Sequence, residues 1–226
     1  MGERRVYEFR DPESLVKWTR WSVYAQVAVA FAAIAAGYLE HDIFVALRDG
    51  AFQSREEALE AARVSDMRQQ VVSVVHVVVT VVSGILILRW VHRANWNVRA
   101  MGESLRFTPG WAVGWFFVPV MNIWRPYQVV KEIWVASFRA IAMQGSAASG
   151  IVGLWWFLWL VYCTLGNVSF RVSMNAKDIP GLISANVLDL AVNLSAVPLC
   201  VVFLAMMGRI QEMQAAGVPG VPEPAA

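Results

Sequence analysis

Four long apolar segments, separated by polar or broken stretches, set the hydrophobic pattern of this chain. They cover residues 21–39, 71–88, 151–170 and 184–207. Each is about as long as an α-helix must be to cross the hydrocarbon core of a bilayer. Because lipid offers no partners for open backbone groups, an apolar span of this length is predicted to be helical. The pattern therefore predicts an all-α integral membrane bundle with four transmembrane helices in a single membrane domain, 21–208.

The segment 109–143 is also apolar, but prolines interrupt it. Thr108 has the side chain of a helix N-cap and Pro109 suits a first helical position, so a helix is predicted to begin there. Its apolar part, 111–124, would extend about 21 Å as a helix, against roughly 30 Å of hydrocarbon core. This length predicts a broken helix that is re-entrant or half-buried and does not span.

A break is predicted at Arg125, because a residue that precedes a proline avoids the helical conformation, and a new helix should begin at Pro126. The second helix is amphipathic, with apolar residues on one face and polar residues on the other. The apolar face holds Val130, Ile133, Trp134, Phe138 and Ile141, and the polar face holds Gln128, Glu132 and Arg139. We expect this helix to lie along the membrane surface.

Three segments are too polar to span, namely 1–20, 40–70 and 209–226. The middle one has seven carboxylates against four arginines and is predicted to be an external loop. Within it, Ser54 and Glu57 have the spacing of a capping box that opens a short helix, and Asp66 is a candidate cap for the next element. The last segment, rich in Pro and Gly, is predicted to be a disordered tail.

The distribution of Lys and Arg favours one of two topologies. With four spans, 13 basic residues lie on the side of both termini and 6 on the other side. If the broken segment crossed the bilayer as a fifth span, the division would be 11 against 8. The positive-inside rule therefore predicts four spans, with the N- and C-termini cytoplasmic in a cell inner membrane.

Composition agrees with a membrane protein and excludes other classes. Of the 226 residues, 58% are hydrophobic and only 16% are charged, which is too apolar for an ordinary soluble domain. The net charge of +2, without a Lys/Arg-rich run, argues against nucleic acid as a partner. Cys163 and Cys200 fall in apolar segments, and no Cys/His cluster has the spacing of a metal site. We expect neither a metal nor a cofactor.

The stretch FTPGWAVGWFFVPVMNIWRPYQVVKEIW, preceded by RWVHRANWNVRAMG, resembles the bacterial membrane family known as domain of unknown function 4328. The resemblance covers residues 18–209. It implies a multi-helix membrane protein without an assigned activity, of a kind frequent in actinobacteria and other soil bacteria. The residues that match its signature are Trp90, Arg93, Asn95, Pro109, Gly110, Trp111, Gly114, Trp115, Pro119, Asn122, Trp124, Arg125, Pro126 and Glu132.

One functional hypothesis is a binding or assembly module. Arg125 lies beside the predicted start of a helix, where unpaired N–H groups and the helix dipole favour an anion. The candidate ligand-binding residues, for a lipid headgroup or another anion on the cytoplasmic side, are Arg125, Asn122, Glu132, Arg93 and Arg99. The expected partners are membrane lipids, and a homo-oligomer is left open. In the alternative, Arg125 pairs with Glu132 or Asp189 and only holds the broken helix in place.

Two further hypotheses depend on polar groups inside the spans. Asn186, Asp189 and Asn193 share one helix face, and His76 lies in the second span. Such residues at membrane depth are features of a small transporter or channel subunit, which would act as an oligomer. An intramembrane enzyme is disfavoured because no nucleophile with a matching base is evident, and a meeting of His76 with Asp189 in the fold is the one arrangement left open for it. We therefore predict no enzymatic activity and no catalytic residue.

Overall fold

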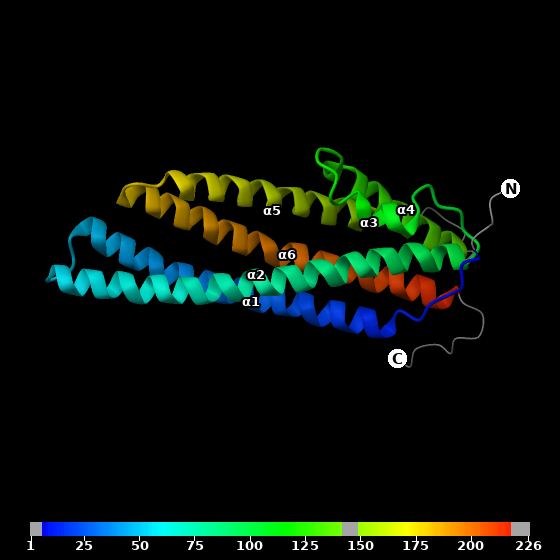
Figure 1. Cartoon of the computed structure of the whole chain (residues 1–226), viewed down its shortest axis with the longest axis horizontal. Helices are drawn as coiled ribbons and strands as arrows, with labels where there is room; N and C mark the ends of the chain where they lie inside the picture. The colour runs from blue at the N-terminus through cyan, green and yellow to red at the C-terminus, as the bar shows by residue number, and fades with distance from the viewer. Residues whose placement is uncertain (1–5, 142–148, 218–226) are drawn as a thin grey trace. The chain divides into compact units, whose positions relative to one another are not determined.

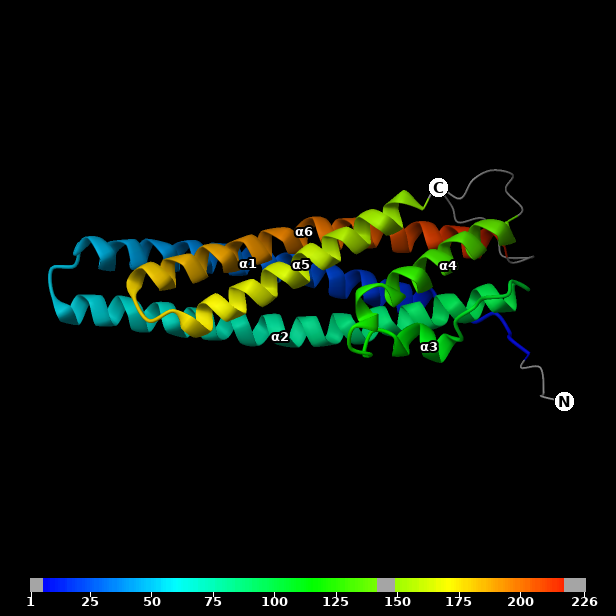
Figure 2. The same ribbon diagram turned by 90° about the horizontal axis from the view of Figure 1, so that it is seen from above.

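The computed structural model describes residues 6–141 and 149–217, and all of its regular elements there are helices (Figures 1 and 2). The chain forms α1 (Glu13–Asp49), α2 (Arg55–Ala100), α3 (Pro109–Gly114), the 3₁₀ helix η1 (Met121–Ile123), α4 (Arg125–Ala140), α5 (Gly150–Asn175) and α6 (Ile179–Ala216). The predicted all-α class is confirmed for these residues.

Four of the helices, α1, α2, α5 and α6, are long and apolar enough to cross a membrane. Each of the four predicted spans lies inside one of them. Few residues in the apolar part of α2 are buried, and its exposed valines include Val74, Val77 and Val78. A surface of this kind is stable only if something apolar covers it, and lipid would do so.

The segment 40–70 differs from the predicted loop, because helices occupy most of it. α1 continues to Asp49 and α2 begins at Arg55, so the connection is short. The capping box is confirmed: the Glu57 N–H donates to Ser54 Oγ at 3.1 Å, and the Glu57 carboxylate accepts from the Gln53 N–H at 2.9 Å. Asp66 caps nothing, since no proline or glycine interrupts α2 there and the helix runs through it.

The C-terminal boundary also differs from the sequence prediction. Residues after Arg209 were predicted to be a disordered tail, but α6 continues to Ala216. Gln214 explains the extra turns, because its side chain is buried and its Nε2 donates to the Ala94 carbonyl and to Ser137 Oγ, both at 3.1 Å. Residues 218–226, and the end of the predicted broken helix at 142–143, lie outside the described part of the chain.

The chain divides into two compact units, to which the long helices each contribute a part. Unit 1 comprises residues 1–21, 84–156 and 202–226. Its core is formed by large side chains of α2, α4 and α6, including Trp90, Ile133 and Met206, which are almost fully buried. Trp90 meets Phe203 edge to face, with ring centroids 5.7 Å apart. Unit 1 contains the whole broken region.

Unit 2 comprises residues 22–83 and 157–201, and small residues determine its packing. Ala30, Ala33 and Ala36 of α1 are buried. A Cβ atom added to Gly37 would lie 2.9 Å from Cδ2 of Leu190 in α6, closer than such atoms normally approach. The small residues of α1 therefore allow α6 to come close, as in many membrane helix pairs.

Replacing Gln214 with alanine tests whether the end of α6 is fixed by its side chain. The change removes two buried hydrogen bonds, so we expect the free energy of unfolding to fall by about 1–3 kcal/mol. Unfolding of the detergent-solubilised protein, followed by tryptophan fluorescence, measures this. The exposed Glu212→Ala on the same helix should change it by less than about 0.5 kcal/mol. Equal effects of the two substitutions would contradict the assignment.

Candidate functional site

The broken region of unit 1 begins and resumes where the sequence predicts, but its first helix is shorter than predicted. The Thr108 hydroxyl caps α3 by accepting from the Trp111 N–H at 3.4 Å. The helix then ends at Gly114, and the predicted helical course to residue 124 is wrong. Pro119 cannot donate to a preceding carbonyl, and Val120 has a φ of 66°, which a helix does not allow.

α4 starts one residue before the predicted restart at Pro126, so Arg125 is helical and the break precedes it at Trp124. It begins at Arg125, with Pro126 in its first turn. We expected its apolar face to rest on the membrane surface, but Val130, Ile133 and Trp134 are buried inside unit 1. Phe138 and Ile141, at the C-terminal end of the same face, are only partly buried. Most of the apolar face of α4 therefore contributes to the core of unit 1, and the position of α4 along a membrane surface stays a prediction.

Glu132 and Arg99, two of the predicted ligand-binding residues, hold the connection between α2 and α3. The Arg99 guanidinium donates to the Leu105 carbonyl at 2.8 Å and to the Phe107 carbonyl at 2.9 Å. The Glu132 carboxylate accepts from the backbone N–H groups of Arg106 and Phe107. Their hydrogen-bonding capacity is thus used by the protein itself, and they position the neighbouring pocket.

Arg125 borders that pocket, which has a volume of about 250 Å³ and which we call the indole pocket. Its lining consists of Arg106, Phe107, Thr108, Trp111, Trp115 and Arg125. The Arg125 guanidinium carbon lies 5.2 Å from the Trp115 ring centroid and 5.7 Å from that of Phe107. Its Nη1 donates to Gln128 Oε1 at 3.0 Å.

Two buried donors at this pocket lack hydrogen-bond partners among the described residues. They are Nε of Arg125 and Nε1 of Trp115. Neither Glu132 nor Asp189 forms an ion pair with Arg125 within the described chain. Asn122 lies nearby in sequence on η1, but it is not among the residues that line the pocket.

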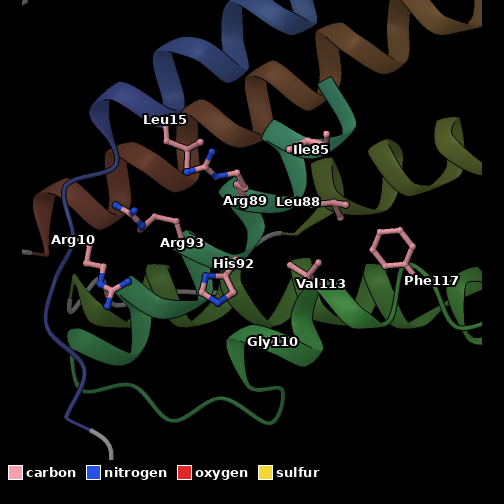
Figure 3. Close-up of a pocket in the computed structure, with 10 residues that line it drawn as sticks. All are labelled: Arg10, Leu15, Ile85, Leu88, Arg89, His92, Arg93, Gly110, Val113 and Phe117. Carbon is pink, nitrogen blue, oxygen red and sulfur yellow. The ribbon is translucent and has the colours of Figure 1, made fainter. Parts of the chain in front are cut away.

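Arg93 belongs to a different pocket of unit 1, of about 540 Å³, which we call the basic pocket (Figure 3). Its lining consists of Arg10, Leu15, Ile85, Leu88, Arg89, His92, Arg93, Gly110, Val113 and Phe117. Arg93 Nη1 donates to the Asp11 carbonyl at 2.7 Å. The sequence does not indicate that Arg10 joins this cluster. The only sequence signal for the basic pocket is the excess of arginine after the second apolar segment.

His92 is the titratable group of the basic pocket, and it lies beyond the predicted span 71–88. Burial lowers its pKa below the ordinary value, and the positive charges of Arg10 and Arg93 lower the pKa further. The imidazole also stacks on Trp96, with ring centroids 6.3 Å apart. Burial and the positive charge around it therefore favour the neutral form of His92.

The predicted intramembrane polar residues lie in unit 2, where Asn186 connects two helices. Its Nδ2 donates to the Gly37 carbonyl at 3.0 Å and to the Glu40 carboxylate at 3.1 Å, and its Oδ1 meets His41 Nδ1 at 3.1 Å. Gln69 also donates to Glu40, at 2.9 Å. Glu40 lies just after the predicted span 21–39, and burial raises its pKa. Sequence reasoning missed Glu40, His41 and Gln69.

The other two predicted polar residues of α6, Asp189 and Asn193, are joined to each other by hydrogen bonds. Asn193 is buried, and its Nδ2 donates to the Asp189 carbonyl at 2.9 Å and to the Asp189 carboxylate at 3.1 Å. His76 of α2 is close enough to Asp189 to interact with it electrostatically. Within residues 6–141 and 149–217, no group of three His, Cys, Asp or Glu side chains could hold a metal ion.

Replacing Glu132 with alanine tests its role as an acceptor for the α2–α3 connection. The backbone amides of Arg106 and Phe107 should exchange with deuterium at least about tenfold faster, since each loses a charge-assisted hydrogen bond and 1.4 kcal/mol corresponds to a factor of ten. Exchange mass spectrometry of peptides covering 103–110 measures this. Lys131→Ala, at the exposed neighbouring position, is the control, and an unchanged rate in Glu132→Ala would contradict the assignment.

Comparison with known proteins places the broken region in a family. Residues 53–212, which run from the start of α2 to near the end of α6, match a family described as a domain of unknown function. α1 lies outside this match, so the match is narrower than the resemblance over residues 18–209. No curated protein and no solved structure matches the chain. Because the matched residues make up more than half of the sequence, the chain belongs to the family of domain of unknown function 4328.

Proposed function

We propose that this protein is an integral membrane binding module whose indole pocket holds an anionic group, such as the phosphate of a lipid headgroup or of a small metabolite. The observation that supports it best is the pair of buried, unpartnered donors, Arg125 Nε and Trp115 Nε1. A buried donor without a partner costs about 1–3 kcal/mol. An anion that accepts from both would remove this cost.

The charges and size of the pocket favour the same ligand class. Two arginines, Arg106 and Arg125, line it, and no acidic side chain does. α4 begins at Arg125, so the positive end of its dipole lies beside the pocket. A volume of about 250 Å³ is below the usual range for drug-sized ligands and suits a single headgroup.

The aromatic walls of the pocket keep Arg125 in place. The guanidinium lies near the rings of Trp115 and Phe107, and Trp111 lies against Trp115 with ring centroids 4.9 Å apart. Arginine stacks on aromatic rings and binds phosphate through two parallel N–H groups, which lysine cannot do. A site that depends on this geometry should therefore distinguish arginine from lysine.

The orientation of the pocket is part of the proposal. Both termini are cytoplasmic, four helices span the inner membrane, and the indole pocket opens towards the cytoplasmic leaflet, whose anionic lipids attract basic residues. The short α3 and η1 enter the membrane only partly. The alternative role for Arg125 is to pin the start of α4 through its hydrogen bond to Gln128.

Replacing Arg125 by glutamine and by lysine separates binding from pinning. We expect Arg125→Gln to weaken binding of glycerol phosphate or phosphatidylglycerol by about tenfold, as a charged hydrogen-bonding partner is worth roughly 1.5–3 kcal/mol, with Arg125→Lys in between. Native mass spectrometry of protein titrated with each probe measures it, and phosphatidylcholine is the comparison lipid. The unfolding temperature should stay within about 2 °C, as expected of a partly exposed side chain.

The control for net charge is Arg139→Gln, which removes an exposed arginine of α4 that is outside the pocket. If both Arg125 substitutions lower the unfolding temperature equally and leave binding unchanged, Arg125 is a pin and the proposal fails. Binding of the lipid but not of glycerol phosphate would assign the ligand to the membrane. Binding of both would assign it to the shared phosphate group. If neither glycerol phosphate nor phosphatidylglycerol binds in any titration, the proposal is overturned.

A further inference from the structure

We propose that the basic pocket is a second, separate site that binds one anionic phospholipid, with the headgroup at the arginines of α2 and an acyl chain along the apolar end of the pocket. It shares no lining residue with the indole pocket. Figure 3 shows that the basic side chains of Arg10 and Arg93 lie towards one end, whereas Leu88, Val113 and Phe117 lie towards the other.

The positive charge of this pocket is not compensated. Three arginines and a histidine line it, and no Asp or Glu side chain does. Within the described residues, none of Arg10, Arg89 and Arg93 forms an ion pair. Arg10 lies over the Trp96 ring at 4.0 Å, and Arg93 binds a backbone carbonyl, so both are held in place while keeping their charge. An anion is the missing partner that this arrangement favours.

The α2 helix carries the change from apolar to basic along one face. Ile85, Leu88, Arg89 and His92 stand at i, i+3, i+4 and i+7, and all line the pocket. At 1.5 Å per residue this face extends about 10 Å, which is the scale of the boundary between the acyl chains and the headgroups. Leu88 is also the last residue of the predicted span 71–88. The pocket therefore straddles the level at which a lipid phosphate would lie.

The size and the apolar lining distinguish a lipid from a soluble anion. About 540 Å³ exceeds what a bare phosphate needs and lies in the range of pockets that hold whole organic ligands. Five of the ten lining residues, Leu15, Ile85, Leu88, Val113 and Phe117, are apolar. Gly110 leaves further room, because a Cβ atom added there would meet nothing within 4 Å. A water-soluble anion would leave this apolar surface unused, and an acyl chain would cover it.

Arg89→Gln is the most direct test, because no hydrogen bond or ion pair within the described residues involves Arg89, and its loss should leave the fold intact. We expect binding of short-chain phosphatidylglycerol to weaken about fivefold, as one basic residue near the membrane surface contributes about 1 kcal/mol. Phe117→Ala should weaken the same lipid without changing charge. Native mass spectrometry at matched lipid concentrations measures both, with the exposed Arg209→Gln as the charge control.

Each result of these binding measurements supports or overturns the lipid site, and the result at the indole pocket is read independently. If Arg89→Gln weakens phosphatidylglycerol and leaves phosphatidylcholine and glycerol phosphate unchanged, the lipid site is supported. If Arg89→Gln has no effect, or if glycerol phosphate competes fully with the lipid, the proposal is overturned. Arg125→Gln should weaken only the lipid held at the indole pocket and leave a second phosphatidylglycerol bound at the basic pocket, and Arg89→Gln should do the reverse. The number of lipids retained by each variant therefore separates failure at one pocket from failure at the other.

His92 gives the lipid site a pH dependence. Arg10 and Arg93 act electrostatically on the imidazole, Arg89 also lines the pocket, and α3 contributes no charged lining residue, so the surrounding charge disfavours protonation of His92. A bound phosphate diester stays charged and stabilises the imidazolium, so binding takes up a proton and affinity should rise as pH falls from about 8 to about 5.5. His92→Gln should remove this rise. A pH profile that is the same in both proteins would contradict the role of His92, and the other two histidines lie in unit 2.

Discussion

A bilayer provides no hydrogen-bond partners for the backbone, and this constraint explains how the chain is arranged. The long helices α1, α2, α5 and α6 satisfy it internally. The broken region does not form a regular helix throughout, and side chains supply partners for part of its backbone. Arg99, Glu132 and Asn95 bind the backbone of residues 105–107, and the Trp156 indole donates to the Ile123 carbonyl at 3.1 Å. These contacts come from three helices of unit 1, and they allow irregular backbone to exist beside the pockets.

The same constraint explains which arginines remain available for a ligand. An arginine that bonds several backbone carbonyls, as Arg99 does, has little capacity left for an anion. Arg125 makes one side-chain hydrogen bond and keeps a buried Nε without a partner. Arg89 and Arg10 retain their full charge in a pocket that lacks carboxylates. The sequence motif Trp-Arg-Pro drew attention to one arginine, but it is the number of backbone contacts that separates structural from available side chains.

The sequence predicted best those features that depend on residues close together in the chain. The four apolar lengths, the Thr108 cap, the restart predicted at Pro126 and observed one residue earlier, and the Ser54/Glu57 capping box each depend on neighbouring residues. It was wrong where distant contacts decide. The extension of α6 depends on Gln214 reaching Ala94 and Ser137, and Val130, Ile133 and Trp134 of α4 are buried within the protein. Amphipathic spacing alone does not distinguish a membrane surface from a protein core.

The polar residues of unit 2 illustrate how hydrogen bonding bears on a transport path. Asn186 uses both ends of its amide to join α6 to the Gly37 carbonyl, Glu40 and His41 of α1. An amide committed to three partners fixes a helix pair, and Gly37 permits the close approach that these bonds require. A permeation site needs the opposite property, since its polar groups must exchange partners with the passing solute. Of the four predicted intramembrane polar residues, Asp189 and His76 carry titratable groups. No described hydrogen bond joins them to Asn186, although the charge of Asp189 acts on Glu40. Binding of a ligand at the basic pocket of unit 1 therefore requires less rearrangement of the described hydrogen bonds than passage of a solute through unit 2.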